Sequence, residues 1–240
     1  MENEPRITWI TGASSGIGSA LAETFVRHGD IVVGTARDEA RLLDVGNRLG
    51  ASSGRYVAMA CDVRKEEAVA ATARKILDRF GKVDVLINSA GVTYFRDFLG
   101  TTPAEFDHVV DTNLKGTFLV TGSVLPSMLE RHQGVIVNIV SYAAKASYTL
   151  SSAYAASKAG VEALMGGLRA EVRDKGIKIV NVFPGAVLTP IWNPKHRERY
   201  GDRMMKPEEV AEPVYQLTCL PASMMVEELI VRPQGGDIKV

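Results

Sequence analysis

The fold of this chain is decided near its start, by the stretch Ile7-Thr8-Trp9-Ile10-Thr11-Gly12-Ala13-Ser14-Ser15-Gly16-Ile17-Gly18. Residues 7–10 form a short apolar and β-branched run, which favours a buried strand, and an amphipathic helical pattern follows from residue 17. Glycines between a strand and a helix let the backbone turn tightly and approach a phosphate, while the helix start offers free N–H groups and a positive dipole end. The stretch therefore predicts a strand, an anion-binding turn and a helix.

Two other functions use a glycine-rich turn at such a place. A nucleoside-triphosphate loop ends in Gly-Lys-Ser/Thr, which the spacing of Gly12, Gly16 and Gly18 does not provide, so a kinase or NTPase is disfavoured. The same segment also fits the Gly-x-Ser-x-Gly pattern of a hydrolase nucleophile elbow, with Ser14 as the serine. An elbow serine follows a central strand, whereas only about ten residues precede this one. The hydrolase is an open but disfavoured alternative.

Short β-branched runs alternate with longer amphipathic stretches along the whole chain, as in consecutive βαβ units. The predicted strands cover residues 7–10, 31–35, 55–60, 83–87, 135–140, 178–182 and 228–231. The predicted helices cover residues 17–28, 39–49, 65–80, 103–131, 153–175 and 207–219. We expect one α/β domain over residues 1–240, a Rossmann-type doubly wound fold with a seven-stranded, mainly parallel sheet and helices on both faces. Residues 185–206 show no clear periodicity and are expected to form a substrate loop.

The composition narrows the choice of partners. The 240 residues include 28 basic and 28 acidic ones, and zero net charge gives no long-range field for nucleic acid or an anionic membrane. The first six residues carry acids where a signal peptide would be positive, so we expect a cytoplasmic protein. Cys61 and Cys219 are expected to be buried thiols, and the spacing of the four histidines predicts no metal site.

A second group of polar residues lies in Tyr154-Ala155-Ala156-Ser157-Lys158, near the start of the predicted helix 153–175. A tyrosine and a lysine four residues apart lie on one helical face. The ammonium group would lower the pKa of the phenol and make Tyr154 a usable proton donor and acceptor. Ser141 ends the predicted strand 135–140, where a parallel sheet opens its ligand crevice. Its hydroxyl can then polarise a carbonyl group beside Tyr154.

The chain resembles the short-chain dehydrogenase/reductase family over essentially its whole length. The matching pieces stand in the family's order: the TGxxxGxG turn at Thr11 to Gly18, Asp62-Val63, Asn88-Ser89-Ala90-Gly91, Asn113, Ser141, the YxxxK pair Tyr154 and Lys158, and Pro184-Gly185 with Thr189. Each piece is weak alone, but their shared order and spacing make chance agreement improbable. Ser89 replaces a usual asparagine, and Lys145, whose head we expect in solvent, stands where a glycine is frequent.

The resemblance implies an NADP(H)-dependent oxidoreductase that transfers a hydride between the nicotinamide and a carbonyl or alcohol substrate. Its implied catalytic residues are Asn113, Ser141, Tyr154 and Lys158, with Tyr154 as general acid and base and Asn113 anchoring a water that relays protons. Its implied cofactor-binding residues are Gly12, Ser14, Ser15, Gly16, Ile17, Gly18, Arg37, Asp62, Val63, Asn88, Ala90, Gly91, Tyr154, Lys158, Pro184, Gly185, Val187 and Thr189. The alternative is a non-catalytic dinucleotide-binding sensor or scaffold, from which the tyrosine or the lysine would be missing.

The choice between the two nicotinamide cofactors depends on the end of the second predicted strand. Folds that prefer NAD place an acid there for the ribose 2′-hydroxyl, whereas this chain has Ala36 followed by Arg37. The planar guanidinium of Arg37 suits a 2′-phosphate, so NADP(H) is predicted. Asp38 leaves NAD(H) open, because a shift of one residue in the turn would bring a carboxylate to the ribose. Ser15, where some NADP-dependent relatives carry a base, slightly weakens the prediction.

The predicted substrate pocket is apolar and aromatic. Its candidate residues lie in 92–95, in 143–148 and in the loop after Gly185, and include Tyr94, Phe95, Tyr148, Ile191 and Trp192. These side chains favour an uncharged or partly aliphatic carbonyl or alcohol, and the charged run 195–199 is expected to be a solvated face. The resemblance also implies a homodimer or homotetramer built partly on the helices that carry Asn113 and Tyr154. Small residues there would allow close helix contact or serve packing within the subunit: Ala159, Ala163, Gly166 and Gly167.

Overall fold

The computed structural model describes residues 4–238, and within them the predicted sheet is confirmed. Its seven strands pair in parallel in the order β3-β2-β1-β4-β5-β6-β7. The strands are β1 (Ile7–Thr11), β2 (Ile31–Ala36), β3 (Tyr56–Ala60), β4 (Val85–Asn88), β5 (Gly134–Ile139), β6 (Ile177–Pro184) and β7 (Glu228–Val231). The helices are α1 (Gly16–Arg27), α2 (Glu39–Arg48), α3 (Glu66–Phe80), α4 (Pro103–Val110), α5 (Gly116–Glu130), α6 (Ser152–Val172), α7 (Pro194–Tyr200) and α8 (Pro207–Thr218).

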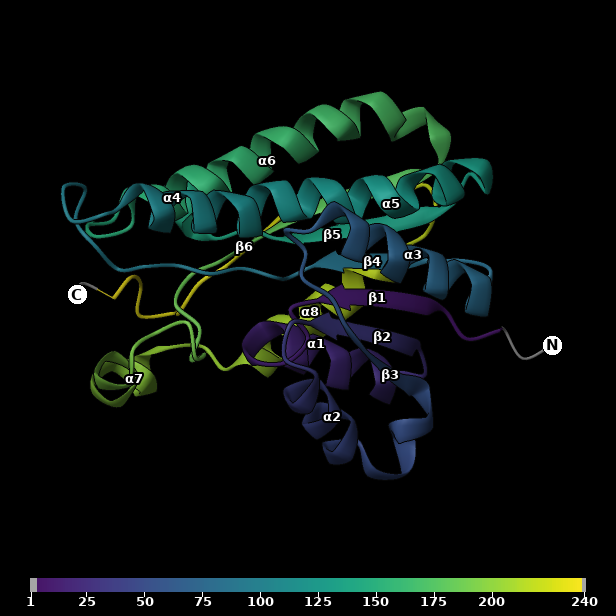
Figure 1. Cartoon of the computed structure of the whole chain (residues 1–240), viewed down its shortest axis with the longest axis horizontal. Coiled ribbons are helices and arrows are strands. Elements are labelled where there is room, and N and C mark those ends of the chain that lie inside the picture. The colour runs from purple at the N-terminus through teal and green to yellow at the C-terminus, as the bar shows by residue number, and fades with distance from the viewer. Residues whose placement is uncertain (1–3, 239–240) are drawn as a thin grey trace.

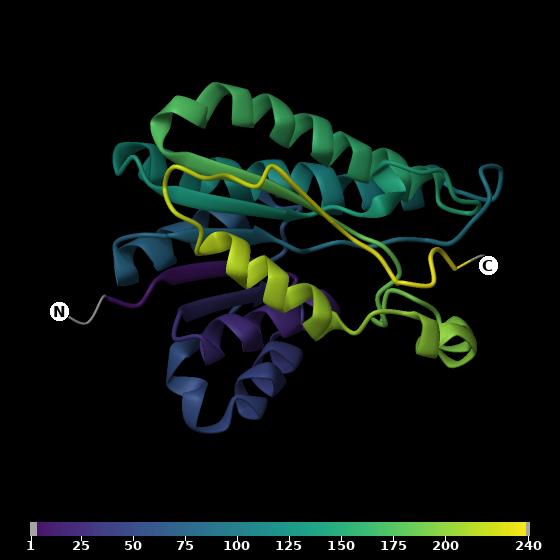
Figure 2. The same cartoon turned by 180° about the vertical axis from the view of Figure 1, so that it is seen from behind.

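Helices cover both faces of the sheet, as expected for a doubly wound fold (Figure 1). Consecutive strand residues point to opposite faces, so Trp9 joins the core beneath α3, α5 and α6, while Ile10 joins the core beneath α1, α2 and α8. Figure 2 shows α8 lying beside α1 on the second face. No helix within residues 4–238 is both long and apolar enough to cross a membrane.

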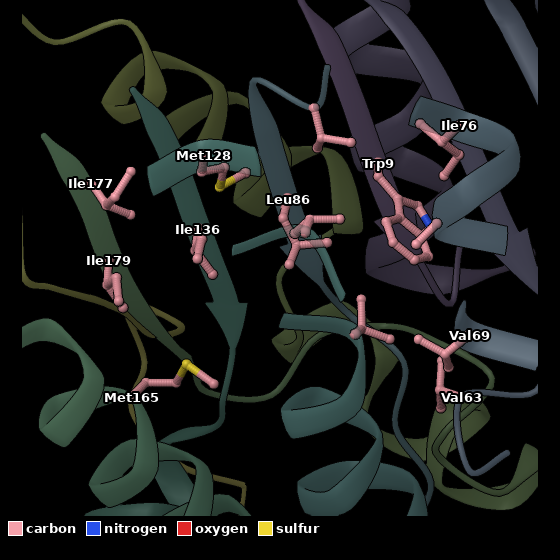
Figure 3. Packing of buried hydrophobic residues seen from close by; sticks show 14 of the residues in the cluster. Trp9, Val63, Val69, Ile76, Leu86, Met128, Ile136, Met165, Ile177 and Ile179 are labelled. Atoms are coloured by element: carbon pink, nitrogen blue, oxygen red, sulfur yellow. The ribbon is translucent and has the colours of Figure 1, made fainter. Parts of the chain in front are cut away.

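The larger core packs strand residues against the α3, α5 and α6 side of the sheet. In Figure 3, Trp9 of β1 lies beside Ile76 of α3, and Met165 of α6 lies in the same core layer as Ile179 of β6. All four side chains are buried. Full burial of one such side chain contributes about 1.5–3 kcal/mol, so this layer holds α6 firmly against the sheet.

The chain is helical from Pro103 to Glu130, as predicted for residues 103–131, but this long helix is not regular. It is divided by a π-helical turn at Asp111–Lys115 between α4 and α5. The following helix start lies close to the loop after β3, because a Cβ on Gly116 would come within 2.7 Å of Val63 Cγ2. A π turn adds one residue to a helical turn and re-aims its side chains. Here it directs Asn113 inward, where that side chain is fully buried.

Two further expectations need correction. Residues 185–206 contain the helix α7, which starts where the Asn193 side chain accepts a hydrogen bond of 2.8 Å from the backbone N–H of His196. Seven residues are too few for a hydrophobic period to reveal a helix. Cys61 is buried as expected, but Cys219 is exposed, because it follows the last turn of α8 where the chain comes to the surface.

Candidate active site

A cleft of ≈ 920 Å³ opens at the carboxyl ends of the parallel strands. This volume lies near the upper end of the range for small-molecule sites, roughly 300–1,000 Å³. The strands β1 and β4 are neighbours in the sheet although β2 and β3 lie between them in the chain. Doubly wound sheets bind ligands at such a switch point.

The glycine-rich turn after β1 forms one wall of the cleft and contacts the segment after β4. Gly12 has a φ of +68°, and a Cβ there would lie 2.8 Å from the Ala90 Cα, so only glycine fits. The Thr11 hydroxyl accepts hydrogen bonds from the backbone N–H groups of Ser89 (3.1 Å) and Ala90 (3.2 Å). These contacts fix two of the predicted motifs relative to each other.

The N-terminus of α1 is suited to a phosphate. Its N-cap residue Ser15 makes no side-chain capping bond, and its first turn contains no acidic residue. The free N–H groups and the positive dipole end therefore remain available to an anion. Ser14, Ser15 and Ile17 line the cleft at this point, so the turn fits the pyrophosphate of a dinucleotide.

Arginine side chains line the end of the cleft at β2 and β3. Arg37 lines the cleft, and within residues 4–238 no carboxylate oxygen lies within 4.0 Å of its nitrogens. Asp38 instead accepts a hydrogen bond from the backbone N–H of Arg41 (3.1 Å) and pairs with its Nε (3.3 Å). The Asp38 carboxylate, which left NAD(H) as an alternative cofactor, thus caps α2 while still lining the cleft beside Arg37. Arg37 is the unpaired cation at this end.

Asp62 and Arg64, which follow β3, form a tight pair at the same end of the cleft. The Asp62 Oδ2 accepts a hydrogen bond of 2.6 Å from Arg64 Nη2, and its Oδ1 accepts one of 2.9 Å from Nε. The hydrogen bonds from Arg64 lower the pKa of Asp62 to about 2. Both residues line the cleft, as does the neighbouring Val63.

At the other end, Ser141, Tyr154 and Lys158 come together on the cleft wall. Ser141 follows β5, and its hydroxyl lies close enough to the Tyr154 hydroxyl to favour the ionised phenol. Lys158 lies one turn further along α6, and its Nζ donates to the Ile139 carbonyl at 2.8 Å and lies 5.8 Å from the Tyr154 ring centroid. A Cβ on Gly91 would be 3.5 Å from this Nζ. The predicted group is therefore assembled around the ends of β4 and β5.

Burial shifts the pKa values of Tyr154 and Lys158 at this end of the cleft. It raises the pKa of Tyr154, with a smaller opposing effect from the Ser141 hydrogen bond, and it lowers the pKa of Lys158 to about 8. The lowered pKa of Tyr154 expected from its neighbouring lysine is therefore wrong for this structure. Desolvation decides the direction because Lys158, with its pKa lowered to about 8, is already neutral at the higher pH where the Tyr154 phenol would ionise.

Asn113 does not line the cleft. Its Oδ1 accepts a bond of 2.8 Å from the Val92 N–H, and its Nδ2 donates to the Val92 carbonyl (3.0 Å) and to the Ser157 hydroxyl (2.9 Å). The side chain thus ties the π turn to the segment after β4 and to α6. Its position is behind Gly91 and beside Lys158.

Asn88, predicted to bind the cofactor, also points away from the cleft. Its Nδ2 donates to the Asn138 Oδ1 (2.9 Å) and to the Thr121 hydroxyl (3.0 Å), and Asn138 donates in turn to Asn181 (3.0 Å). The three asparagines are register partners on β4, β5 and β6. Strand alternation turns this side chain to the helix face, which the motif alone does not reveal.

Aromatic side chains line the substrate side of the cleft. Phe95 and Trp192 stack with ring centroids 5.1 Å apart, and Tyr148 and Ile191 complete the predicted set. Tyr94 is the exception, since its hydroxyl bonds to His108 Nδ1 at 2.7 Å outside the cleft.

Lys145 neither lines the cleft nor keeps its head free in solvent. It pairs with Glu162 and Glu228, each at 2.9 Å. Both glutamates come from elements remote in the sequence, α6 and β7, so no local pattern indicated the pairing.

A profile of the short chain dehydrogenase family matches residues 6–199. The chain belongs to the short-chain dehydrogenase/reductase family. It is therefore an oxidoreductase, and its parallel sheet with flanking helices is the fold expected from the resemblance.

Relatives with names or solved structures cover nearly the whole chain. A sepiapterin reductase from Chlorobaculum tepidum is 36% identical over 240 residues, 97% of this chain and 98% of the relative. A metagenomic short-chain oxidoreductase solved in complex with NADP has a TM-score of 0.84 and 33% identity, covering 95% and 97% of the two chains. An alcohol dehydrogenase from Thermococcus sibiricus, complexed with 5-hydroxy-NADP, has a TM-score of 0.88 and 30% identity over 99% and 100%.

The structure of this short-chain dehydrogenase/reductase also places residues that the sequence did not single out. Arg64, Thr112, Tyr142 and Asp237 line the cleft. Arg64 follows the recognised Asp62-Val63 pair directly, so its position was a usable signal, whereas Asp237 reaches the cleft only through the return of the C-terminal segment.

No histidine is among the described lining residues, so Ser14 has no adjacent base and the hydrolase alternative loses its support.

Proposed function

We propose that this chain is an NADP(H)-dependent reductase and dehydrogenase acting on a carbonyl group and the corresponding alcohol. The observation that carries the proposal is the convergence of Ser141, Tyr154 and Lys158 at one end of a cleft whose other end holds the unpaired Arg37. Solved relatives in complex with NADP and a 5-hydroxy derivative support the cofactor. Names that include a sepiapterin reductase and an alcohol dehydrogenase support the reaction class.

When bound, NADP(H) supplies or accepts the hydride. Tyr154 donates a proton to the carbonyl oxygen during reduction and removes it from the alcohol during oxidation. Ser141 hydrogen-bonds to the same oxygen and keeps it beside Tyr154. Lys158 holds positive charge next to the phenol and binds the nicotinamide ribose, while Asn113 keeps the Val92 backbone and α6 in place from behind and anchors the relay water.

The residues proposed to hold the cofactor follow the cleft from one end to the other. The turn after β1 binds the pyrophosphate, Arg37 binds the 2′-phosphate, and the segment after β6 packs on the nicotinamide. The proposed residues are Gly12, Ser14, Ser15, Gly16, Ile17, Gly18, Arg37, Asp62, Val63, Ala90, Gly91, Tyr154, Lys158, Pro184, Gly185, Val187 and Thr189. Asn88 supports this wall indirectly through its hydrogen bonds across the sheet.

The proposed substrate is uncharged and flat or partly aliphatic. The stacked pair Phe95 and Trp192, together with Tyr148 and Ile191, offers mainly apolar and aromatic surface next to Tyr154. We further propose that residues 1–240 act as one dinucleotide-binding domain, with residues 185–206 closing the substrate side. The cytoplasmic location and the homodimer or homotetramer remain predictions.

The decisive experiment is the variant Tyr154→Phe, after a screen of NADPH oxidation with ketones, aldehydes and acyl carriers has found a substrate. Because only the proton-carrying oxygen is removed, we expect turnover to fall about 100- to 10,000-fold with the dissociation constant of NADPH unchanged. Tyr148→Phe is the matched control and should alter KM with little loss of turnover.

Two results would contradict the proposal. Tyr154→Phe with more than a tenth of wild-type turnover would exclude its acid–base role. A wild-type protein that binds NADPH but reduces no member of the panel would favour the sensor or scaffold instead.

A further inference from the structure

A network of charges surrounds Lys145, close to Ser141 in the sequence but outside the cleft. The Lys145 Nζ lies 2.9 Å from Glu162 Oε1 on α6 and 2.9 Å from Glu228 Oε2 on β7. It also lies 4.2 Å from the ring centroid of Phe183 on β6. Only a quarter of the Lys145 side chain (25%) is exposed. An ammonium held by two carboxylates and a ring is fixed better than one in a single surface pair.

The turn that ends at Lys145 begins at Ser141. The Ser141 hydroxyl oxygen accepts a hydrogen bond of 3.1 Å from the Ala143 N–H, and the Lys145 N–H donates to the Tyr142 carbonyl at 2.9 Å. The turn is thus a short hydrogen-bonded unit, with the Ser141 side chain at its start and Lys145 at its end. None of the three residues between them is buried, so full burial of a side chain does not hold this unit in place.

The network reaches the face of α6 that carries the proposed proton donor. Glu162 lies four residues after Lys158 and eight after Tyr154, so the three side chains follow one another along one side of the helix. The contact between Lys145 and Glu162 therefore connects the end of the Ser141 turn to the helix face from which the Tyr154 phenol projects.

Loss of the ammonium would break this connection. Glu162 and Glu228 both reach the same Lys145 nitrogen, so their carboxylates would repel each other without it. The apolar ring of Phe183 cannot replace the charge. A shift of about 1 Å in a reacting group can cost about 100-fold in rate, so even a small movement of the Ser141 turn would slow the reaction.

We propose that Lys145 is a positioning residue for carbonyl reduction. It sets the place of the Ser141 hydroxyl relative to the Tyr154 phenol by tying the turn after Ser141 to α6 and β7. Because Lys145 lies outside the cleft, it acts on the reaction only through Ser141. The inference rests on the proposed acid–base chemistry at Tyr154. It gives an ion-pair network outside the cleft a task in turnover in addition to its effect on stability.

The test places Lys145→Met in two backgrounds, the wild type and Ser141→Ala. The substrate is the ketone or aldehyde that the wild type reduces fastest in the NADPH panel, followed in single turnovers with enzyme in excess. In the wild-type background we expect Lys145→Met to slow the chemical step about 5- to 50-fold. Ser141→Ala alone should slow it about 100- to 1,000-fold. In that background Lys145→Met should change the rate by less than about twofold, because the group through which it acts is absent.

Further variants separate the charge from the fold. Lys145→Arg keeps a cation that can pair with both glutamates and should recover most of the rate. Glu162→Gln keeps the pair with Glu228, so it remains testable if Lys145→Met does not fold, and should slow the step about 3- to 10-fold only when Ser141 is present. Lys175→Met is the matched control, because Lys175 is exposed and makes no ion pair among the described residues. The affinity and stoichiometry of NADPH binding should not change in any of these variants, which separates a slower step from a smaller folded fraction.

The opposite outcomes are distinct. A wild-type rate in Lys145→Met, or the same fold loss in both backgrounds, would overturn the proposal, because Lys145 would then not act through Ser141. A Lys145→Arg variant as slow as Lys145→Met would also overturn it, since the ion pairs would not be the cause. In each case an active wild type that loses its turnover in Tyr154→Phe would leave the proposed function standing. A wild type that reduced no carbonyl compound of the panel would overturn both.

Discussion

Lys158 is the residue whose chemistry depends most on its surroundings. It is almost fully buried, its Nζ has one hydrogen bond of 2.8 Å to the Ile139 carbonyl, and no carboxylate compensates its charge among the described residues. Burial disfavours the ammonium form and lowers its pKa to about 8. The charge that Tyr154 needs beside it is thus present at neutral pH but not far above it.

This shift predicts the pH dependence of reduction. Because burial raises the pKa of Tyr154, the phenol stays protonated and able to donate, whereas Lys158 loses its proton above about pH 8. We expect kcat/KM for carbonyl reduction to be level below about pH 8 and to fall above it. Initial rates of NADPH oxidation across the pH range test this. If kcat/KM stayed level up to about pH 10, where an ordinary lysine titrates, the lowered pKa of Lys158 would be contradicted.

Arg37 is expected to set the preference for NADPH over NADH. A charge-assisted contact to a 2′-phosphate is worth about 1.5–3 kcal/mol, or about one to two decades in affinity. We expect Arg37→Ala to weaken the binding of NADPH by that amount and the binding of NADH only slightly. The dissociation constants are measured at one ionic strength, because salt screens such contacts. Asp38→Asn serves as the control, since Asp38 caps α2. This variant should change the affinities for NADPH and NADH by the same factor. An unchanged NADPH/NADH ratio in Arg37→Ala would indicate NAD(H).

The positions of single side chains could be predicted well where a motif fixes the backbone. They could be predicted less well where the alternation of side chains along a strand decides which face of the sheet they take. Ser141, Tyr154 and Lys158 meet on the cleft because one strand end and one helical turn place them. Asn88 stands inside an equally recognisable motif, but as the last residue of β4 its side chain turns to the helix face. Which face a strand residue takes depends on pairing, and the pairing is not local.

At the scale of elements, Lys145 joins three segments that are remote in the sequence. It follows the short 3₁₀ turn Tyr142–Ala144 after Ser141, pairs with Glu162 of α6 and Glu228 of β7, and lies 4.2 Å from the Phe183 ring centroid of β6. Two ion pairs and a cation–π contact together contribute about 1–2 kcal/mol. Lys145 thus helps to hold the segment after Ser141 against α6.

We expect Lys145→Met to lower the melting temperature by about 2–6 °C at low salt, since the two glutamates are left without their common cation. The difference from wild type should narrow in about 1 M salt, where the pairs are screened. Lys175→Met is the control, because Lys175 is exposed and makes no ion pair among the described residues. Equal melting temperatures for the two variants would show that the pairs contribute nothing.

The strands could be predicted to within about two residues at each end, whereas two helical features could not be predicted. Buried parallel strands read as continuous apolar runs bounded by polar turns, so their number and limits are visible. The π turn at Asp111–Lys115 differs from a continuous helix by one inserted residue, which hardly disturbs a 3.6-residue period. The short helix α7 is recognisable only by Asn193 and Pro194 at its start.

At the scale of the whole molecule, the helices α4, α5 and α6 form an outer layer on one face of the sheet (Figure 1). This layer exposes apolar side chains. Phe118 on α5 is 57% exposed and Phe106 on α4 is 44% exposed. On α6, a Cβ on Gly166 or Gly167 would meet no atom within 4 Å, so this surface leaves room for a close neighbour. These features agree with the homodimer or homotetramer expected from the sequence, in which the same helices pack against a second copy.

The assembly is tested best by placing a charge in this layer. If Phe118 packs against a second copy, Phe118→Glu buries an unpaired carboxylate at the contact, and the complex dissociates. Sedimentation velocity at micromolar concentration should give a multiple of 26.0 kDa for the wild type and one subunit for Phe118→Glu, with NADPH still bound. Leu43→Glu is the matched control, because Leu43 is 54% exposed but lies on α2, on the other side of the sheet, and should leave the assembly intact. A wild type that sediments only as a single subunit would show that these helices face solvent, and the apolar surface would then need another explanation.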